Sequence, residues 1–230
     1  MTISFIRQIP VLFPLLLIPA AVFSQGNFTA YWEPQVAINY GVTPTYSHNF
    51  SIGNRNYVLK DGDLQVSGRQ VDIAHFSNLQ VFGNQSIALG VQYRFRSNFG
   101  DGGNNELRLT QQYNITHGAE KVRYGHRLRT EQRITKSSTI HRFRYRGTVD
   151  FPLNGLKLDV GEPYFAGSLE SLLSVSQHIR PNYDQRFSTT IGWLLNEHTK
   201  IQGGLEYRLE NYTHATEQVF FIQSSLVLSF

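Results

Sequence analysis

Apolar residues occupy alternate positions over the last fourteen residues of the chain, Glu217 to Phe230. The apolar file consists of Phe220, Ile222, Leu226, Leu228 and Phe230, and Ser224 is its one break. A period of two predicts a β-strand with one face toward an apolar medium and the other toward a polar one. Because outer-membrane β-barrels usually end on such a strand with a terminal aromatic residue, we expect residues 217–230 to close a barrel. The apolar file is then the expected signal for the outer-membrane assembly machinery.

The same alternation recurs along the rest of the chain. It predicts eleven candidate strands, near residues 28–40, 44–60, 63–82, 86–97, 105–116, 121–135, 139–149, 163–176, 185–196, 199–212 and 217–230. The clearest of them run for about 9–12 residues, the length that a tilted strand needs to cross a hydrocarbon core. Since a single-chain bacterial barrel has an even number of strands, we expect one candidate to be split or spurious. We favour 12 strands over 10 and expect the error between residues 40 and 82.

Turn-forming residues separate these candidate strands. Short links are predicted at Asp61-Gly62, Gly83-Asn84, Lys136–Ser138 and Asn196–Lys200, and longer ones at 97–105, 150–163 and 179–185. Outer-membrane barrels place short turns on one rim and longer loops on the other. We expect an imperfect version of that pattern here.

The first residues predict export from the cytoplasm. Arg7 is the one charge ahead of an apolar stretch from Ile9 to Phe23, and Val22-Phe23-Ser24 fits a cleavage site. A transmembrane anchor is the alternative, but the stretch contains three prolines and is shorter than the roughly 20 apolar residues that span a bilayer. We therefore expect residues 1–24 to be a cleaved signal peptide and residues 25–230 to be one barrel domain.

Composition supports an all-β membrane barrel. The hydrophobic content of 40% is too low for a helical membrane protein but fits a barrel with a hydrophilic interior. Cysteine is absent, which excludes disulfide scaffolds, thiolate metal sites and cysteine nucleophiles. The chain has 16 arginines against 5 lysines.

Many of these arginines fall on one face of neighbouring predicted strands. On a lipid-facing wall, each arginine near the membrane midplane would cost about 2–4 kcal/mol, so this face must point inward. The predicted lumen charges are Arg94, Arg96, Glu106, Arg108, Arg123, Arg127, Arg129, Glu131, Arg133, Arg142, Arg144, Arg146, Glu170, Glu206 and Arg208.

Two interpretations of the arginine-rich face remain open. In a packed lumen the arginines pair with carboxylates, because a low-dielectric interior leaves neither charge unpaired. In an open lumen a surplus of arginine favours anions. Residues 94–146 contain ten arginines against Glu106, Glu120 and Glu131. This count predicts that some positive charge survives the pairing.

The central segment also resembles a known family. His126-Arg127-Leu128-Arg129-Thr130-Glu131-Gln132-Arg133, followed by Arg142-Phe143-Arg144-Tyr145-Arg146 and Pro152, is similar to signatures of a Gram-negative family of outer-membrane barrels catalogued as domain of unknown function 2490. Trp32 fits the same pattern, and the resemblance extends over most of residues 28–230. It implies an outer-membrane barrel and brings no established activity. In size and arginine-lined strands the chain also resembles the small porins for acidic oligosaccharides.

The expected function is therefore structural membrane residence or porin-like passage that favours small anionic solutes. The expected partners are outer-membrane lipids and the assembly machinery; a basic lumen behind a signal peptide has no access to nucleic acid. Two alternatives are a lipid-modifying enzyme of the phospholipase or deacylase type and a soluble periplasmic β-sandwich. We expect no enzymatic activity, since His126, Thr130 and Gln132 on the lipid side lack the sequence pattern of such enzymes. The eight histidines are scattered singly, so we expect no metal or other cofactor.

Overall fold

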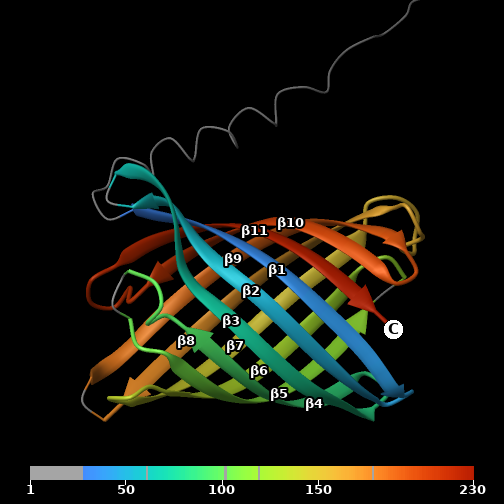
Figure 1. The fold of residues 1–230 in the computed structure, drawn as a ribbon. Coiled ribbons are helices and arrows are strands. Elements are labelled where there is room, and N and C mark those ends of the chain that lie inside the picture. Colours follow the sequence, from blue (N-terminus) through green and yellow to red (C-terminus); the bar gives the residue numbers. More distant parts are fainter. Residues whose placement is uncertain (1–27, 61, 101–102, 119, 178) are drawn as a thin grey trace, which may run out of the picture.

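The computed structural model describes residues 28–60, 62–100, 103–118, 120–177 and 179–230, which form a closed β-barrel (Figure 1). Its strands are β1 (Phe28–Thr43), β2 (Tyr46–Lys60), β3 (Asp63–Phe82), β4 (Gln85–Phe95), β5 (Glu106–Gly118), β6 (Arg123–Ile134), β7 (Thr139–Pro152), β8 (Pro163–Ser176), β9 (Ile179–Asn196), β10 (Thr199–Glu210) and β11 (Glu217–Ser229). A closed sheet contradicts the β-sandwich alternative. Within the described residues, no helix has the length and apolar character to cross a membrane. The predicted signal peptide, residues 1–24, lies outside them.

The barrel has eleven strands in the described chain, so the prediction of 12 was wrong. With an odd number of alternating strands, the first and the last run in the same direction. β1 and β11 accordingly pair in parallel, from Phe28 opposite Gln218 to Asn39 opposite Ser229. Figure 1 shows the blue β1 and the red β11 side by side with their arrowheads toward the same end of the barrel. Parallel pairing still satisfies the backbone donors and acceptors, so closure does not require an even count.

The segment between residues 40 and 82 contains no miscounted strand. β2 and β3 match the predicted strands 44–60 and 63–82 closely, but their pairing is irregular. Arg55 pairs with Gln70 and Asn56 pairs with Gly68, which leaves Arg69 as the extra residue of a bulge. A bulge changes which side of the sheet a residue faces, and this one brings Arg69 to the cavity inside the barrel.

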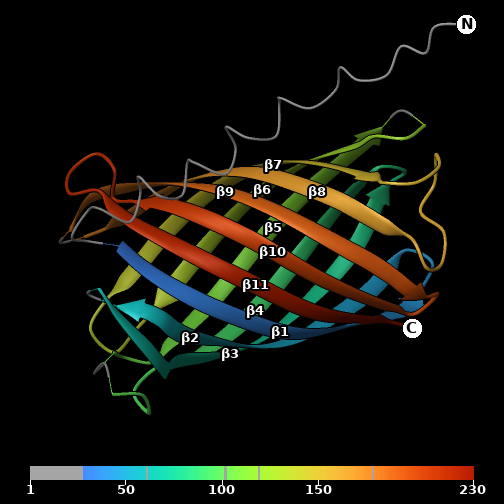
Figure 2. The same cartoon turned by 90° about the horizontal axis from the view of Figure 1, so that it is seen from above.

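The two rims of the barrel do not divide into short and long links. We call the end at which Phe230 lies the C-terminal rim, and the other end the opposite rim; Figure 2 shows the tilted strands running between them. The long link 153–162, between β7 and β8, lies at the C-terminal rim, and the long link 96–105, between β4 and β5, lies at the opposite rim. Long links therefore lie at both rims, and the separation of turns from loops is imperfect, as the turn-forming residues predict.

The apolar faces of the strands point outward. Large apolar side chains exposed on the outer wall include Trp32, Val36, Phe50, Ile73, Leu89, Leu128, Phe143, Phe187, Trp193, Leu205 and Ile222. Trp32 donates a hydrogen bond from its indole Nε1 to Ser224 Oγ (3.0 Å). Ser224, which interrupts the apolar file of β11, is therefore the hydrogen-bond partner of an outward-facing tryptophan. By contrast, Phe221 points inward and has no exposed surface.

Parallel closure predicts a specific cross-link. Val36 and Leu226 are partners across the seam of β1 and β11, both on the outer wall. Because paired strands lie about 4.8 Å apart, the double substitution Val36→Cys and Leu226→Cys should form a disulfide under mild oxidation. The chain has no other cysteine, so the product is a single, faster-migrating band on a non-reducing gel. The matched control is Val36→Cys with Ile222→Cys, four residues out of register; equal cross-linking of both pairs would contradict the seam.

Candidate functional site

The interior of the barrel contains a cavity of about 820 Å³. Because side chains alternate along each strand, every strand that sends apolar residues outward sends polar ones into this space. All eleven strands contribute lining residues, among them Glu33, Ser51, Asp72, Arg94, Arg108, Arg133, Arg142, Ser168, Arg186, Gln202, Arg208 and Phe221. The cavity is therefore walled mainly by charged and neutral polar side chains, with a smaller apolar part.

Charge is concentrated toward the opposite rim. Arg94 lies at the end of β4 and Arg108 at the start of β5; likewise Arg133 lies at the end of β6 and Arg142 at the start of β7. Since neighbouring strands run antiparallel, these strand ends meet at the same rim, the one away from Phe230. Toward the C-terminal rim the lining is mostly uncharged and includes Ser51, Thr148, Ser168, Thr190, Gln202 and Ser225. We call the charged zone the arginine collar, defined by Arg55, Arg94, Arg108, Arg133, Arg142, Arg144, Arg186 and Arg208.

Arg144 joins two carboxylates at the centre of the collar. Its Nη1 donates to Glu131 Oε1 (2.7 Å) and its Nη2 donates to Glu170 Oε2 (2.7 Å). Glu170 also accepts from Arg146 Nε (3.1 Å), and a guanidinium nitrogen of Arg186 lies 3.7 Å from it. Both glutamates are buried. Guanidinium and carboxylate match in shape, so this chain of ion pairs ties β6, β7, β8 and β9 together on the inside.

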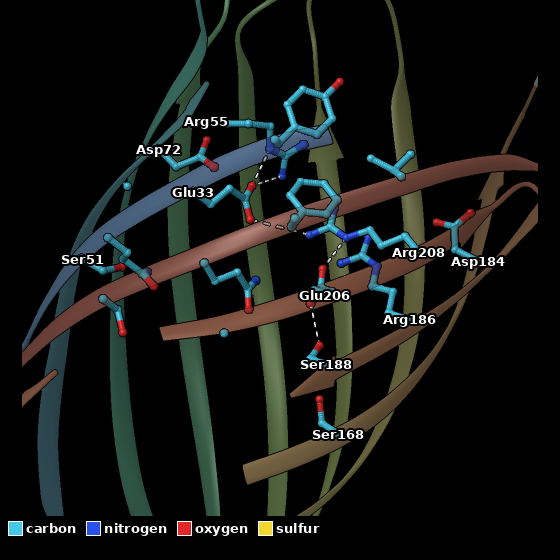
Figure 3. Close-up of a pocket in the computed structure, with 18 of the residues that line it drawn as sticks. Glu33, Ser51, Arg55, Asp72, Ser168, Asp184, Arg186, Ser188, Glu206 and Arg208 are labelled. Atoms are coloured by element: carbon cyan, nitrogen blue, oxygen red, sulfur yellow. Dashed lines mark hydrogen bonds and ion pairs between the residues drawn. The ribbon is translucent and has the colours of Figure 1, made fainter. Parts of the chain in front are cut away.

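Similar pairs continue around the rest of the collar. Glu106 binds Arg108 and Arg133, the latter at 2.6 Å, and Asp72 accepts two hydrogen bonds from Arg94 (2.6 and 2.7 Å). Figure 3 shows the pairs on the other side of the barrel: Arg55 with Glu33, and Arg208 with Glu206 and Glu33. Ser188 Oγ donates to the same Glu206 (2.8 Å).

Aromatic rings fill one side of the charged zone. Phe221 packs against Tyr31, with 5.1 Å between ring centroids, and Tyr57 and Val219 complete the buried cluster. The guanidinium carbon of Arg208 lies 3.7 Å from the centre of the Phe221 ring. Contact of this kind stabilises a cation by the electron-rich face of the ring. The wall formed by β1, β2 and β11 is thus packed where it meets the cavity.

Some arginines bond to neutral groups. Arg96 Nε donates to Gln70 Oε1 (3.1 Å), Arg127 Nε to Asn114 Oδ1 (3.0 Å) and Arg142 Nε to Ser174 Oγ (3.1 Å). In the described part of the chain, no carboxylate forms an ion pair with these three. Burial, and then the charge of Arg94, lower the pKa of Arg96 to about 10, so it stays protonated at neutral pH. The lumen consequently combines a paired network with unneutralised positive charge.

The predicted lumen charges fall into two groups. All except Arg123 lie on the inner faces of their strands or directly beside them. Arg123 is 66% exposed at the C-terminal rim, where it pairs with Asp150 (3.0 Å). Sequence reasoning missed Glu33, Arg55, Arg69, Asp72 and Arg186. Four of these could have been found from their alternation with outward apolar residues, whereas Arg69 faces the cavity because of the bulge.

The outer wall carries two polar clusters among its apolar residues. On β5 and β6, Thr130 Oγ1 donates to Gln111 Oε1 (2.6 Å), and Gln111 Nε2 donates to Gln132 Oε1 (3.2 Å). These polar residues are strand-to-strand contacts. In the second cluster, His48 Nδ1 lies 3.0 Å from His75 Nε2 and 3.4 Å from Ser77 Oγ.

The first cluster borders an apolar groove of about 1070 Å³ that runs across the outer wall, and Ser77 of the second also lines it. Its other lining residues include Leu79, Leu89, Leu128, Phe143 and Ser171. Among the described residues, no group of three or more histidine and acidic side chains is placed to hold a metal ion.

Comparison with known proteins places the chain in a family. Residues 30–219 match the model of a family described as "Protein of unknown function (DUF2490)", which confirms the resemblance seen in the His126–Arg133 segment. The chain is also similar to the solved structure of the siderophore receptor PirA from Pseudomonas aeruginosa, with 14% sequence identity and a TM-score of 0.32. That similarity covers 78% of this chain and 35% of the receptor, so the chain spans about a third of the receptor's length. A search of curated proteins gave no match.

The ion-pair network predicts a large loss of stability when its centre is removed. Arg144→Gln leaves Glu131 and Glu170 without their closest partner, and breaking a buried pair in this way costs about 3–5 kcal/mol. Urea titration of the folded protein in detergent, followed by the fluorescence of Trp32 and Trp193, measures the change. The matched control is Arg123→Gln, which breaks an exposed pair worth less than about 1 kcal/mol. Equal midpoints for the two variants would contradict a structural role of the collar.

Proposed function

We propose that this chain, which belongs to the DUF2490 family of unknown function, is an outer-membrane β-barrel whose arginine-lined lumen favours small anionic solutes. The observation that carries the proposal is the combination of a polar cavity with arginines that bond to neutral partners. The paired arginines stabilise the wall, and the arginines without a carboxylate partner make the lumen positively charged. The two interpretations of the arginine-rich face are in this view complementary.

Residence in a membrane is supported by the outer wall. Its exposed apolar side chains, including Leu89, Leu128 and Ile222, would be in contact with water in a soluble protein. A closed sheet is also one of the two architectures that satisfy all backbone hydrogen bonds in lipid. Outer-membrane lipids are therefore the proposed partners of this wall. We keep the apolar file of β11, ending at Phe230, as the proposed signal for the assembly machinery.

Selectivity for anions is supported by the chemistry of arginine. A guanidinium group does not lose its proton in a protein, so Arg96, Arg127 and Arg142 keep their charge wherever they lie. In a confined space with little water, such charges are poorly screened and lower the energy of a nearby anion. A cavity of about 820 Å³ is large enough for a small acidic solute. We propose passive movement and no catalytic step for this lumen.

Conductance measurements test the proposal. The mature protein should be recovered with the outer membrane, change its gel mobility on boiling, and form discrete channels in planar bilayers. We expect a reversal potential that indicates anion preference, and a weaker preference in Arg127→Gln because one fixed charge with a neutral partner is removed. Arg123→Gln, at the exposed rim, is the control and should leave the preference almost unchanged. A cation-selective channel, or a correctly folded barrel with no conductance, would refute passage of anions.

A second candidate function, hydrolysis of lipid esters, is favoured by the cluster of Ser77, His48 and His75. Ser77 lines the apolar groove, where an acyl chain could lie. In this reaction Ser77 Oγ attacks the ester carbonyl carbon while His48 takes the proton and passes it to the leaving alcohol. Water then releases the fatty acid from the serine, with His48 again moving the proton.

Release of fatty acid from phospholipid in detergent micelles decides this second candidate. If Ser77 is the nucleophile, Ser77→Ala should lower the rate at least about 100-fold. Ser171→Ala is the matched control, since Ser171 lines the same groove at a distance from the histidines. Absence of fatty acid release by the unaltered protein excludes the hydrolase function.

A further inference from the structure

Arg142 differs from the other arginines at the centre of the collar. Arg144 binds two carboxylates, and Arg133 binds Glu106. Arg142 lines the cavity and donates from Nε to Ser174 Oγ, while its two terminal nitrogens have no carboxylate within 4.0 Å in the described part of the chain. A guanidinium that faces a cavity and whose two terminal nitrogens (its fork) bind no carboxylate is available to a ligand.

The surroundings of Arg142 contain further unused polar atoms. Arg142, Ser174 and Asn182 are successive partners across β7, β8 and β9, so their inward side chains form one row. Asn182 Oδ1 is buried and has no hydrogen-bond partner. Arg186, four residues further along β9, is buried, and its Nε also lacks a partner. All four residues line the cavity or contact a residue that does.

These positive charges cannot be relieved by loss of a proton. Arginine remains protonated in proteins, and like charges in a poorly screened space repel one another strongly. Glu170 is shared among Arg144, Arg146 and Arg186, and Glu106 is shared between Arg108 and Arg133. Glu131, the cross-strand neighbour of Arg142, binds Arg144 through Oε1, and its Oε2 has no hydrogen-bond partner. Asp184, between Asn182 and Arg186 on β9, is buried and accepts a hydrogen bond from the backbone N–H of Asn211. In the described part of the chain no carboxylate lies within 4.0 Å of the Arg142 guanidinium, so a counter-anion from outside the chain can neutralise its charge.

We infer that Arg142, together with Arg186 and Asn182, binds a doubly charged oxyanion such as phosphate or sulfate, either free or as the end group of a larger acidic solute. The planar fork of Arg142 suits two oxygens of such a group. Ser174 accepts from Arg142 and keeps its own hydroxyl hydrogen for the ligand. The amide of Asn182 donates when its NH₂ group occupies the position of the unpartnered oxygen, an orientation that exchanges two atoms of similar size. As a substrate class for the lumen, this inference rests on the proposed function.

Stability and calorimetry together test the site. In the unaltered protein, sodium phosphate should raise the unfolding midpoint above that in sodium chloride of equal ionic strength, and titration calorimetry should show saturable binding. Arg142→Gln should weaken binding at least about tenfold, because one charge-assisted, two-pronged contact is lost. The same variant should be at least as stable as the unaltered protein in chloride, since it removes a repelling charge and, in the described part of the chain, breaks no ion pair. Arg142→Lys keeps the charge without the fork and should bind with intermediate affinity.

The probes distinguish the sources of the anion. Inorganic phosphate, sulfate and glucose 6-phosphate should all bind, and glucose should not; binding of the inorganic ions without the sugar phosphate restricts the site to free oxyanions. Arg123→Gln, at the rim, should bind phosphate like the unaltered protein. Loss of stability of Arg142→Gln in chloride would show that Arg142 is a structural member of the network and would overturn the inference. So would phosphate binding that this substitution leaves unchanged, or equal stabilisation by every salt.

Failure of the site and failure of the proposed function give different results. Anion-selective conductance without saturable phosphate binding would contradict the binding site and agree with the proposed passage of anions. Saturable binding by a folded barrel that does not conduct would support the binding site and contradict the passage of anions.

Discussion

Closure of the β-sheet on itself is the constraint on which the rest of the structure depends. Pairing between β1 and β11 removes the two free edges and divides every strand into an inner and an outer face. Because neighbouring residues point to opposite sides of the sheet, closure determines whether nearly every side chain faces the interior or the outside of the barrel. The parallel seam shows that an odd number of strands meets this constraint as fully as an even one.

The enclosed space then imposes its own requirement on charge. Arginine and carboxylate side chains from neighbouring strands pair within it, and single groups such as Glu170 and Arg144 each serve several partners. Removing a charge from water costs free energy. These ion pairs offset that cost because their geometry is good and their hydrogen bonds are numerous. The network is not balanced, however. Arginines with neutral partners, such as Arg127 and Arg142, give the lumen a chemistry that a fully paired core would lack.

Stability and the proposed binding of anions thus depend on the same residue type at different positions. Arg144 ties the inner wall together, while Arg142, two residues away on the same face, has its fork free toward the cavity. Charge is also distributed unevenly along the barrel, since the collar lies near the opposite rim, whereas toward the C-terminal rim the cavity lining is mostly uncharged and the Arg123–Asp150 pair lies at the rim itself. A solute entering from the two ends would therefore meet different electrostatic fields.

The sequence by itself determined the strands, their two faces and the basic character of the interior, because alternation is a local property that needs no partner. It placed Arg144 inside and Leu226 outside, and its eleven candidate segments correspond to the eleven strands, although the predicted link 179–185 was wrong because β9 already begins at Ile179. Tertiary structure decided what depends on strands far apart in the chain. The parallel seam, the burial of Phe221 beside Arg208, and the inward turn of Arg69 at a bulge have no local signal. Which arginine lacks a carboxylate was likewise decided by the register between strands, because a partner across a sheet is set by pairing and not by spacing in the sequence.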